Sequence, residues 1–192
     1  MKLCKENILE NLVGYGKVSF YYALLVRNKS FFPKVFIIWK VGVSKMIRVL
    51  LVQGANLNYL GKREPEIYGK TTAQELDTIL KQHAKTKGYK LEIFYTNIEG
   101  EAINRIYKAA DEGVDGLVMN PAGFTYAGYA LKDCIKGVGL PYVEVHISNI
   151  AKRNIHCVLS YVSEGVIFGF GLYGYIIALD AMLDVLVAKV KG

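Results

Sequence analysis

The chain has 192 residues, a length typical of one domain, and 52% of them are hydrophobic, so a core can form without disulfides or metals. The formal charge of +7 would suggest nucleic-acid or membrane partners. However, residues 1–45 hold eight of the 24 Lys and Arg residues and two of the 17 Asp and Glu residues. Residues 46–192 therefore hold sixteen basic and fifteen acidic residues, a net charge of +1. Composition therefore gives no support for nucleic-acid binding, and three cysteines at irregular spacing fit a reducing, cytoplasmic setting better than a disulfide framework or a zinc site.

The first 45 residues differ in texture from the rest. Aromatic and aliphatic clusters at 20–26 and 35–39 are flanked by Lys or Arg, and no apolar run reaches the roughly 18 residues that a membrane span needs. Neither a secretory signal nor a transit peptide fits this pattern well. We expect residues 1–45 to be an extension of unknown role or a misplaced start before a native Met46; a weak membrane-surface anchor is the less favoured alternative.

From Met46 onward, short apolar strands alternate with amphipathic helices. The run 47–52 predicts a buried parallel strand, and Thr72 with Glu75 three residues later predicts a capping box on a helix that Gly88 ends. Further strands are predicted at 91–95, 115–119, 141–145 and 166–168, and further helices around 103–110, 127–136 and 172–187. This alternation predicts an α/β domain over residues 46–192: a doubly wound, five-stranded parallel sheet of flavodoxin-like order.

Ligands of such sheets bind beyond the carboxyl ends of the strands, so the segments that follow the strands are the candidate site. The connection 53–69 has seventeen residues where about two to six are usual, which predicts a lid. It carries Arg63 and Tyr68. A free phenol is mostly protonated at neutral pH, but a nearby guanidinium favours the phenolate, which can act as a general base. The alternative is that Tyr68 packs against the sheet edge and Arg63 is a solvated ion-pair partner.

His146 stands just past a predicted strand, where side chains enter the crevice. Glu144 lies two residues back on the same face and could orient or charge the imidazole. A protonated histidine can hand a proton to a departing hydroxyl, whereas a purely structural histidine at a strand end is the alternative. Ile147 and Ser148 offer consecutive N–H groups and a hydroxyl, a possible carboxylate cradle.

Three segments taken together resemble the type II 3-dehydroquinate dehydratase (dehydroquinase) family. They are Leu-Gly-Lys-Arg-Glu-Pro-Glu-Ile-Tyr-Gly at 60–69, Glu-Val-His-Ile-Ser-Asn at 144–149 and Gly-Leu-Tyr-Gly-Tyr at 171–175, within a resemblance that spans 47–187. It implies a hydro-lyase that converts 3-dehydroquinate to 3-dehydroshikimate by anti elimination through an enolate. The setting would be the shikimate pathway of aromatic amino acid biosynthesis or quinate catabolism, and the reaction would use no metal, cofactor or covalent lysine adduct.

The resemblance also implies a role for each site residue. Tyr68 would remove the proton next to the ketone, Arg63 would hold it as phenolate, and Asn56 would position a water that stabilises the enolate. His146, held by Glu144, would protonate the leaving hydroxyl. The groups expected to bind substrate are Asn120, Tyr126, Asp133, Ile147, Ser148 and Arg153. Arg153 would close over the site. Asp133 would reach the site of a neighbouring subunit in a trimer or dodecamer.

The sequence departs from the family pattern at four places. Asn-Gly-Pro-Asn becomes Gln-Gly-Ala-Asn at 53–56, Asn-His-Glu-Gly becomes Asn-Ile-Glu-Gly at 97–100, a Thr-His pair becomes Thr125-Tyr126, and Cys157 stands where a second arginine is expected. These changes leave the proton-transfer groups intact and remove some of the side chains that bind the ring hydroxyls of the substrate in the family. Two alternatives to an ordinary dehydroquinase therefore stay open: a paralogue that dehydrates a related cyclic hydroxy-keto acid, and a non-catalytic binding module.

Overall fold

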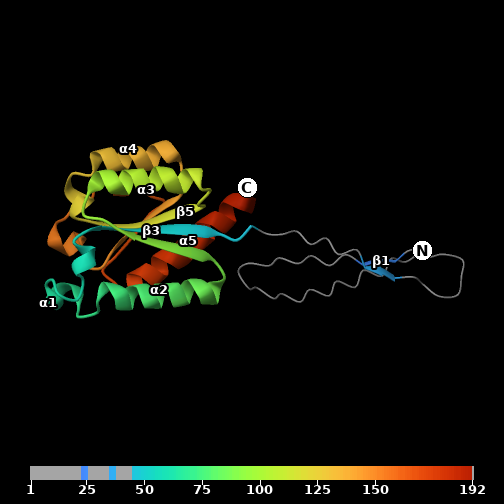
Figure 1. The fold of residues 1–192 in the computed structure, drawn as a ribbon, viewed down its shortest axis with the longest axis horizontal. Helices are drawn as coiled ribbons and strands as arrows, with labels where there is room; N and C mark the ends of the chain where they lie inside the picture. Colours follow the sequence, from blue (N-terminus) through green and yellow to red (C-terminus); the bar gives the residue numbers. More distant parts are fainter. Residues whose placement is uncertain (1–22, 26–34, 38–44, 192) are drawn as a thin grey trace, which may run out of the picture.

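A computed structural model describes residues 23–25, 35–37 and 45–191. Residues 45–191 form a parallel sheet covered by helices on both faces (Figure 1). Its strands are β3 (Arg48–Ala55), β4 (Lys90–Tyr95), β5 (Gly116–Ala122), β6 (Tyr142–His146) and β7 (Gly165–Phe168). Their spatial order is β4-β3-β5-β6-β7, which confirms the predicted flavodoxin-like, doubly wound topology.

Two further strands lie in the N-terminal part of the chain. β1 (Ala23–Leu25) and β2 (Val35–Ile37) pair antiparallel in a sheet of their own. The expectations for the other residues of the 1–44 segment fall outside the described residues. No helix in the described part of the chain is long and apolar enough to cross a membrane.

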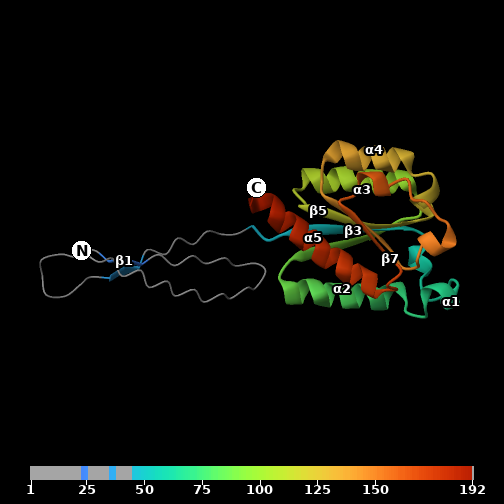
Figure 2. The ribbon, with the colours of Figure 1, turned by 180° about the vertical axis from the view of Figure 1, so that it is seen from behind.

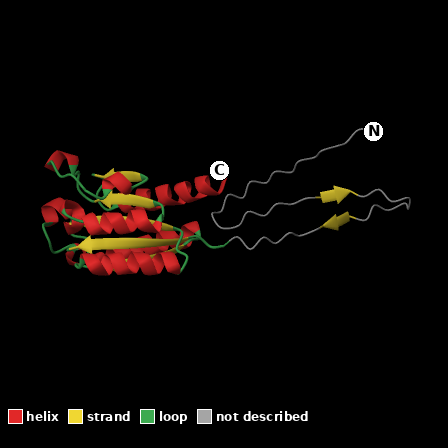
Figure 3. Ribbon diagram, turned by 90° about the horizontal axis from the view of Figure 1, so that it is seen from above, coloured by secondary structure: helices red, strands yellow, loops and turns green. Residues whose placement is uncertain are grey.

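Two pairs of helices cover the sheet. α2 (Ala73–Lys87) and α5 (Tyr173–Lys191) lie on one face, and α3 (Glu99–Asp111) and α4 (Tyr129–Val138) lie on the other (Figures 1 and 2). Each face therefore has its own core. The α2/α5 side buries Leu76, Leu80 and Leu179, and the α3/α4 side buries Ile106, Leu131 and Ile135. Because all five strands are parallel, their carboxyl ends meet at one end of the domain (Figure 3).

Two strands extend further than the sequence predicted. β3 runs to Ala55 and β5 to Ala122, and these two residues are register partners. The extension depends on Gly54, because a Cβ there would lie 2.1 Å from the backbone oxygen of Pro121. Only a residue without a side chain lets the strands approach so closely. Gln53 and Asn120, expected in loops, consequently lie inside the buried sheet.

The helix ends show which local signals were reliable. Both halves of the predicted Thr72–Glu75 capping box are present at the start of α2, and Gly88 ends that helix with φ of 78°. α4 begins at Tyr129, two residues later than predicted, because residues 123–126 form a separate 3-10 helix, η2 (Gly123–Tyr126). α5 continues four residues beyond the predicted end at 187.

Candidate functional site

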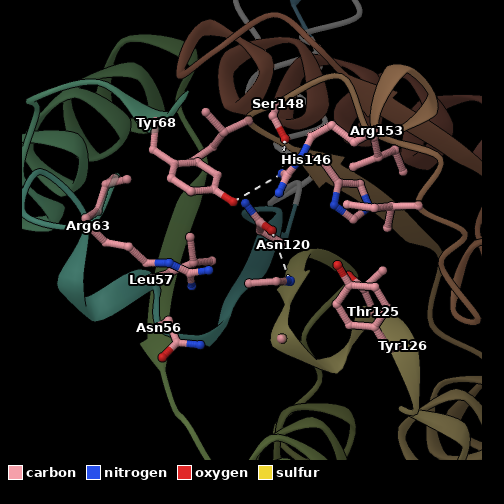
Figure 4. A pocket seen from close by; sticks show the side chains of 16 residues that line it. Asn56, Leu57, Arg63, Tyr68, Asn120, Thr125, Tyr126, His146, Ser148 and Arg153 are labelled. Carbon is pink, nitrogen blue, oxygen red and sulfur yellow. Dashed lines mark hydrogen bonds between the residues drawn. The ribbon is translucent and has the colours of Figure 1, made fainter. Parts of the chain in front are cut away.

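A cavity of about 270 Å³ lies beyond the carboxyl ends of β3, β5 and β6. On one side it is bounded by the long connection after β3, which contains the 3-10 helix η1 (Leu57–Tyr59) and the short helix α1 (Pro65–Tyr68). On the other sides lie η2 and the segment after β6 (Figure 4). The position is the one expected for a doubly wound sheet, and the size suits one small compact molecule.

Tyr68 reaches into this cavity from α1 and meets two arginines. Its hydroxyl oxygen accepts a hydrogen bond of 3.2 Å from Nη1 of Arg153, and the guanidinium carbon of Arg63 lies 5.6 Å from its ring centroid (Figure 4). Sequence reasoning assigned the phenol's charge partner to Arg63, but in this structure Arg63 contacts the ring face and pairs through Nε with Glu64. The Tyr68 hydroxyl is instead hydrogen-bonded by Arg153, which lies 85 positions further along the chain.

Arg153 also connects the lid to the segment after β6. The same Nη1 donates to the hydroxyl of Ser148 at 2.9 Å, so one guanidinium holds Tyr68 and Ser148 together. The hydrogen bond to Tyr68 is the main cause of the raised pKa of Arg153, although burial acts in the opposite direction. Ile147 and Ser148 both line the cavity, as expected for a cradle next to His146.

His146 lies at the end of β6 and lines the cavity opposite the lid. Its Nε2 is 2.8 Å from Oε1 of Glu144, the contact expected from their two-residue spacing. The partner of Nε2 is thereby fixed, and Nδ1 is the ring nitrogen left for a molecule in the cavity. His146 is 5% exposed and Glu144 is completely buried.

Glu144 receives hydrogen bonds from four side chains. Besides His146, the hydroxyls of Ser160 and Tyr142 lie 2.6 Å and 3.0 Å from its carboxylate oxygens, and the Cys157 thiol lies 3.3 Å away. Burial alone would raise the pKa of Glu144. The hydrogen bonds from His146 and Ser160, the charge of His146 and the thiol of Cys157 together hold that pKa below its usual range. Glu144 is therefore a buried carboxylate at neutral pH.

Ser160 had no signal in the sequence, because it lies 16 positions beyond Glu144. Tyr142 lies two residues before Glu144 on the same strand, so the spacing that predicts the His146 contact also places Tyr142 on that face. Cys157 stands where the family pattern has an arginine, a position that predicts proximity to the site but not a contact with Glu144. Burial, followed by the charge of Glu144, raises the pKa of its thiol to about 11, so the group is a neutral donor. Cys157 is not among the described residues that line the cavity, and its thiol donates to Glu144 instead.

The remaining predicted residues divide into two groups. Asn56, Asn120 and Tyr126 line the cavity, with Asn56 at its floor in a left-handed conformation of φ 76° and Tyr126 on the wall facing the lid (Figure 4). Asp133 is exposed on α4 and is not among the described cavity-lining residues of its own chain. A role for it within one subunit is not supported by this geometry, whereas the expected role toward a neighbouring subunit stays a prediction.

One group of side chains has the donor types of a transition-metal site. Oxygen, nitrogen and sulfur atoms of Glu144, His146 and Cys157 lie within 4.8 Å of one another. The four hydrogen bonds to Glu144 already occupy both of its carboxylate oxygens, and a metal would have to displace the protons of the thiol and the imidazole. The residues therefore fit a hydrogen-bonded carboxylate better than a resident ion.

The architecture and the site define a class of protein: a flavodoxin-like α/β enzyme with a phenol beside two guanidinium groups and a carboxylate-bound imidazole around one small cavity. Comparison with known proteins narrows the class. The family model described as dehydroquinase class II matches residues 47–183. The chain belongs to the class II (type II) dehydroquinase family.

Relatives and solved structures agree with this assignment. A 3-dehydroquinate dehydratase from Polynucleobacter asymbioticus is 45% identical over 144 residues, which are 73% of this chain and 97% of that protein. A type II dehydroquinase from Butyrivibrio crossotus is similar in structure, with a TM-score of 0.69, 37% identity and coverage of 71% of this chain and 97% of that one. A type II dehydroquinase from Propionibacterium acnes gives a TM-score of 0.68 at 37% identity, with coverage of 73% and 99%.

Proposed function

We propose that this chain is a hydro-lyase that dehydrates 3-dehydroquinate to 3-dehydroshikimate, by anti elimination through an enolate. Support comes from its family and from relatives at 43% to 45% identity that bear the name 3-dehydroquinate dehydratase. The observation that carries the proposal is the phenol of Tyr68 held by Arg153 and covered by Arg63, in the same cavity as a histidine bound to a buried carboxylate. The pathway would be aromatic amino acid biosynthesis or quinate catabolism.

Tyr68 is the proposed base. Removal of the proton beside the ketone requires a phenolate, and two guanidinium groups next to one phenol stabilise that negative charge. When the phenolate takes the proton, the charge moves to the enolate oxygen. A water positioned by Asn56 would stabilise this oxygen by hydrogen bonding.

His146 is the proposed acid. Glu144 stabilises the imidazolium through Nε2, and Nδ1–H then donates its proton to the departing hydroxyl, which leaves as water. Proton removal and proton donation by groups from different walls of the cavity suit an anti elimination. The substrate's carboxylate would bind to the N–H groups of Ile147 and Ser148 and to the Arg153 guanidinium. Asn120 would bind a ring hydroxyl of the substrate.

The test follows the ultraviolet absorbance of the conjugated enone product after 3-dehydroquinate is added to purified protein. Turnover by the wild type, with kcat reduced roughly 100- to 10,000-fold in Tyr68→Phe and in His146→Ala, is the expected result. Lys108→Ala, an exposed change on α3 away from Asp133, serves as the folded control. A well-folded wild type that produces no enone would reject the proposal and favour a binding module on the same fold.

Tyr126 supports a second candidate, a paralogue for a related cyclic hydroxy-keto acid. This side chain lines the cavity where the family pattern has histidine, and it is 62% exposed. Its phenol hydroxyl can therefore form hydrogen bonds with a ligand that differ from those of a histidine. Turnover of 3-dehydroquinate should be compared with turnover of analogues that lack one ring hydroxyl. A higher kcat/KM for a truncated analogue would favour the paralogue; a higher value for 3-dehydroquinate would favour the first proposal.

We further propose a cytoplasmic homo-oligomer, a trimer or a dodecamer. Exposed aromatic side chains support an interface beside Asp133: Tyr129 is 61% exposed, Tyr161 is 86% exposed, and Nζ of Lys132 lies about 6 Å from both ring centroids. Light scattering would measure the mass in solution. Monomers at assay concentration with full turnover would contradict a site that needs Asp133 of a neighbour.

A further inference from the structure

Three polar side chains form a row across the buried part of the sheet. Tyr95 on β4, Gln53 on β3 and Asn120 on β5 are register partners, so their side chains leave the sheet on the same face. Tyr175 of α5 is completely buried on that face and joins Gln53 to Asn120 by hydrogen bonds. Of these four side chains, only Asn120 lines the cavity.

The direction of these hydrogen bonds is fixed by the backbone. The N–H of Ala122 donates to Oδ1 of Asn120 at 3.2 Å, and a backbone N–H can only donate. Asn120 must therefore present Nδ2 to Tyr175, whose oxygen accepts at 2.8 Å. The single proton of Tyr175 then goes to Oε1 of Gln53, also at 2.8 Å.

Two observations indicate that this direction is maintained at a cost. Within the described residues, Nε2 of Gln53 is buried without a hydrogen bond of ordinary geometry, its neighbour being the hydroxyl of Tyr95, although a flipped amide would have offered it to Tyr175. Ala122 has φ of 48°, which is unfavourable for a residue with a Cβ. Burial raises the pKa of Tyr175, so its hydroxyl stays protonated and remains a donor to Gln53.

We propose that Tyr175 and Gln53 are positioning residues that, together with the N–H of Ala122, hold the Asn120 amide in one orientation: Ala122 holds Oδ1, and the Tyr175–Gln53 pair holds Nδ2. In that orientation one Nδ2 proton and one Oδ1 lone pair remain for the cavity. A hydroxyl both donates and accepts, so an amide held in this way can bind a ring hydroxyl of the substrate through both atoms. The identity of the substrate rests on the proposed function, but the orientation of Asn120 does not.

The variant Tyr175→Phe keeps the buried ring and removes only the hydroxyl. We expect KM for 3-dehydroquinate to rise roughly tenfold while kcat changes less than about threefold, because Asn120 binds substrate and does not transfer protons. Tyr89→Phe is the matched control, since Tyr89 is also buried and its hydroxyl contacts His83 instead. In an Asn120→Ala background, Tyr175→Phe should change KM no further, because the side chain through which it acts is gone.

A crystal structure of Tyr175→Phe gives a readout that needs no turnover. The proposal expects the Asn120 amide to turn away from the orientation seen with Tyr175 and to vary between protomers. An unchanged Asn120 orientation together with an unchanged KM would overturn it, as would equal KM effects of Tyr175→Phe with and without Asn120. If the wild type fails to turn over 3-dehydroquinate, the proposed function fails, and the orientation of Asn120 in the variant structure still decides the positioning role.

Discussion

At the scale of single residues, Glu144 shows how a buried charge depends on neutral donors. Its folded-state pKa lies below the ordinary value of 4.5, so it stabilises the fold above about pH 4.5, and this stabilisation is lost as pH falls through the lower folded pKa. Glu144→Gln should therefore lower the free energy of unfolding by roughly 1 to 3 kcal/mol at neutral pH, with the difference shrinking in acid. Urea unfolding from about pH 3 to pH 7 measures it.

The control for this pH series is Glu164→Gln. Glu164 forms an exposed ion pair with Lys189 and should contribute less than about 1 kcal/mol. A Glu144→Gln effect that stays constant with pH would contradict the assignment of a lowered pKa. An effect that increases in acid would contradict its direction.

Gly54 sets the distance between two strands at the cavity floor. A Cβ at this position would lie 2.1 Å from the Pro121 oxygen and 2.9 Å from the Asn120 oxygen, and both are backbone atoms that cannot rotate away. Gly54→Ala should cost more than about 2 kcal/mol of unfolding free energy and raise KM in any folded fraction, because Asn120 is displaced. Gly137→Ala on α4 meets nothing within 4 Å and should be neutral or stabilising. Similar unfolding midpoints for the two variants would refute the close approach.

At the scale of secondary-structure elements, signals between near neighbours predicted the fold well. The Thr72–Glu75 capping box, Gly88 and the alternation of strands and helices depend on neighbours within about one turn or one element, and these predictions are confirmed. Contacts between distant segments were not predictable. The Arg153–Tyr68 contact spans 85 positions and the Tyr175–Gln53 contact spans 122. The strand extension that buries Gln53 depends on how closely two backbones approach, which periodicity does not record.

The lid gives a prediction at the same scale. Its charged part is exposed, and its hydrogen bond to the segment after β6 is the single Arg153–Tyr68 contact among the described residues. A substrate carboxylate and ring would connect the two sides, so 3-dehydroquinate at saturation should slow tryptic cleavage after Lys62 and Arg63 several-fold. Mass spectrometry of the fragments measures this rate. Cleavage after Lys108, exposed on α3, serves as the control, and equal protection at both places would argue against lid closure.

At the scale of the whole molecule, residues 45–191 contain both cores, the complete sheet and every described side chain that lines the cavity. The family match begins at residue 47, and 144 residues of this chain cover 97% of a dehydratase from Polynucleobacter asymbioticus. We therefore propose that the catalytic unit is residues 46–192 and that residues 1–45 are an extension of unknown role outside it.

A chain that begins at Met46 tests this division. It loses the Lys45–Asp115 ion pair, in which Lys45 is 66% exposed, so the free energy of unfolding should fall by less than about 1 kcal/mol. Its kcat/KM for 3-dehydroquinate should stay within about twofold of the full chain, because the acid, the base and their partners are retained. Lys45→Ala in the full chain is the matched control, because it removes the ion pair and leaves the hydrogen bond from the Arg48 N–H to Asp115 in place. A shortened chain that is insoluble, or whose kcat falls more than that of Lys45→Ala, would show that the first 45 residues belong to the catalytic unit, because the shortening removes no residue that lines the cavity.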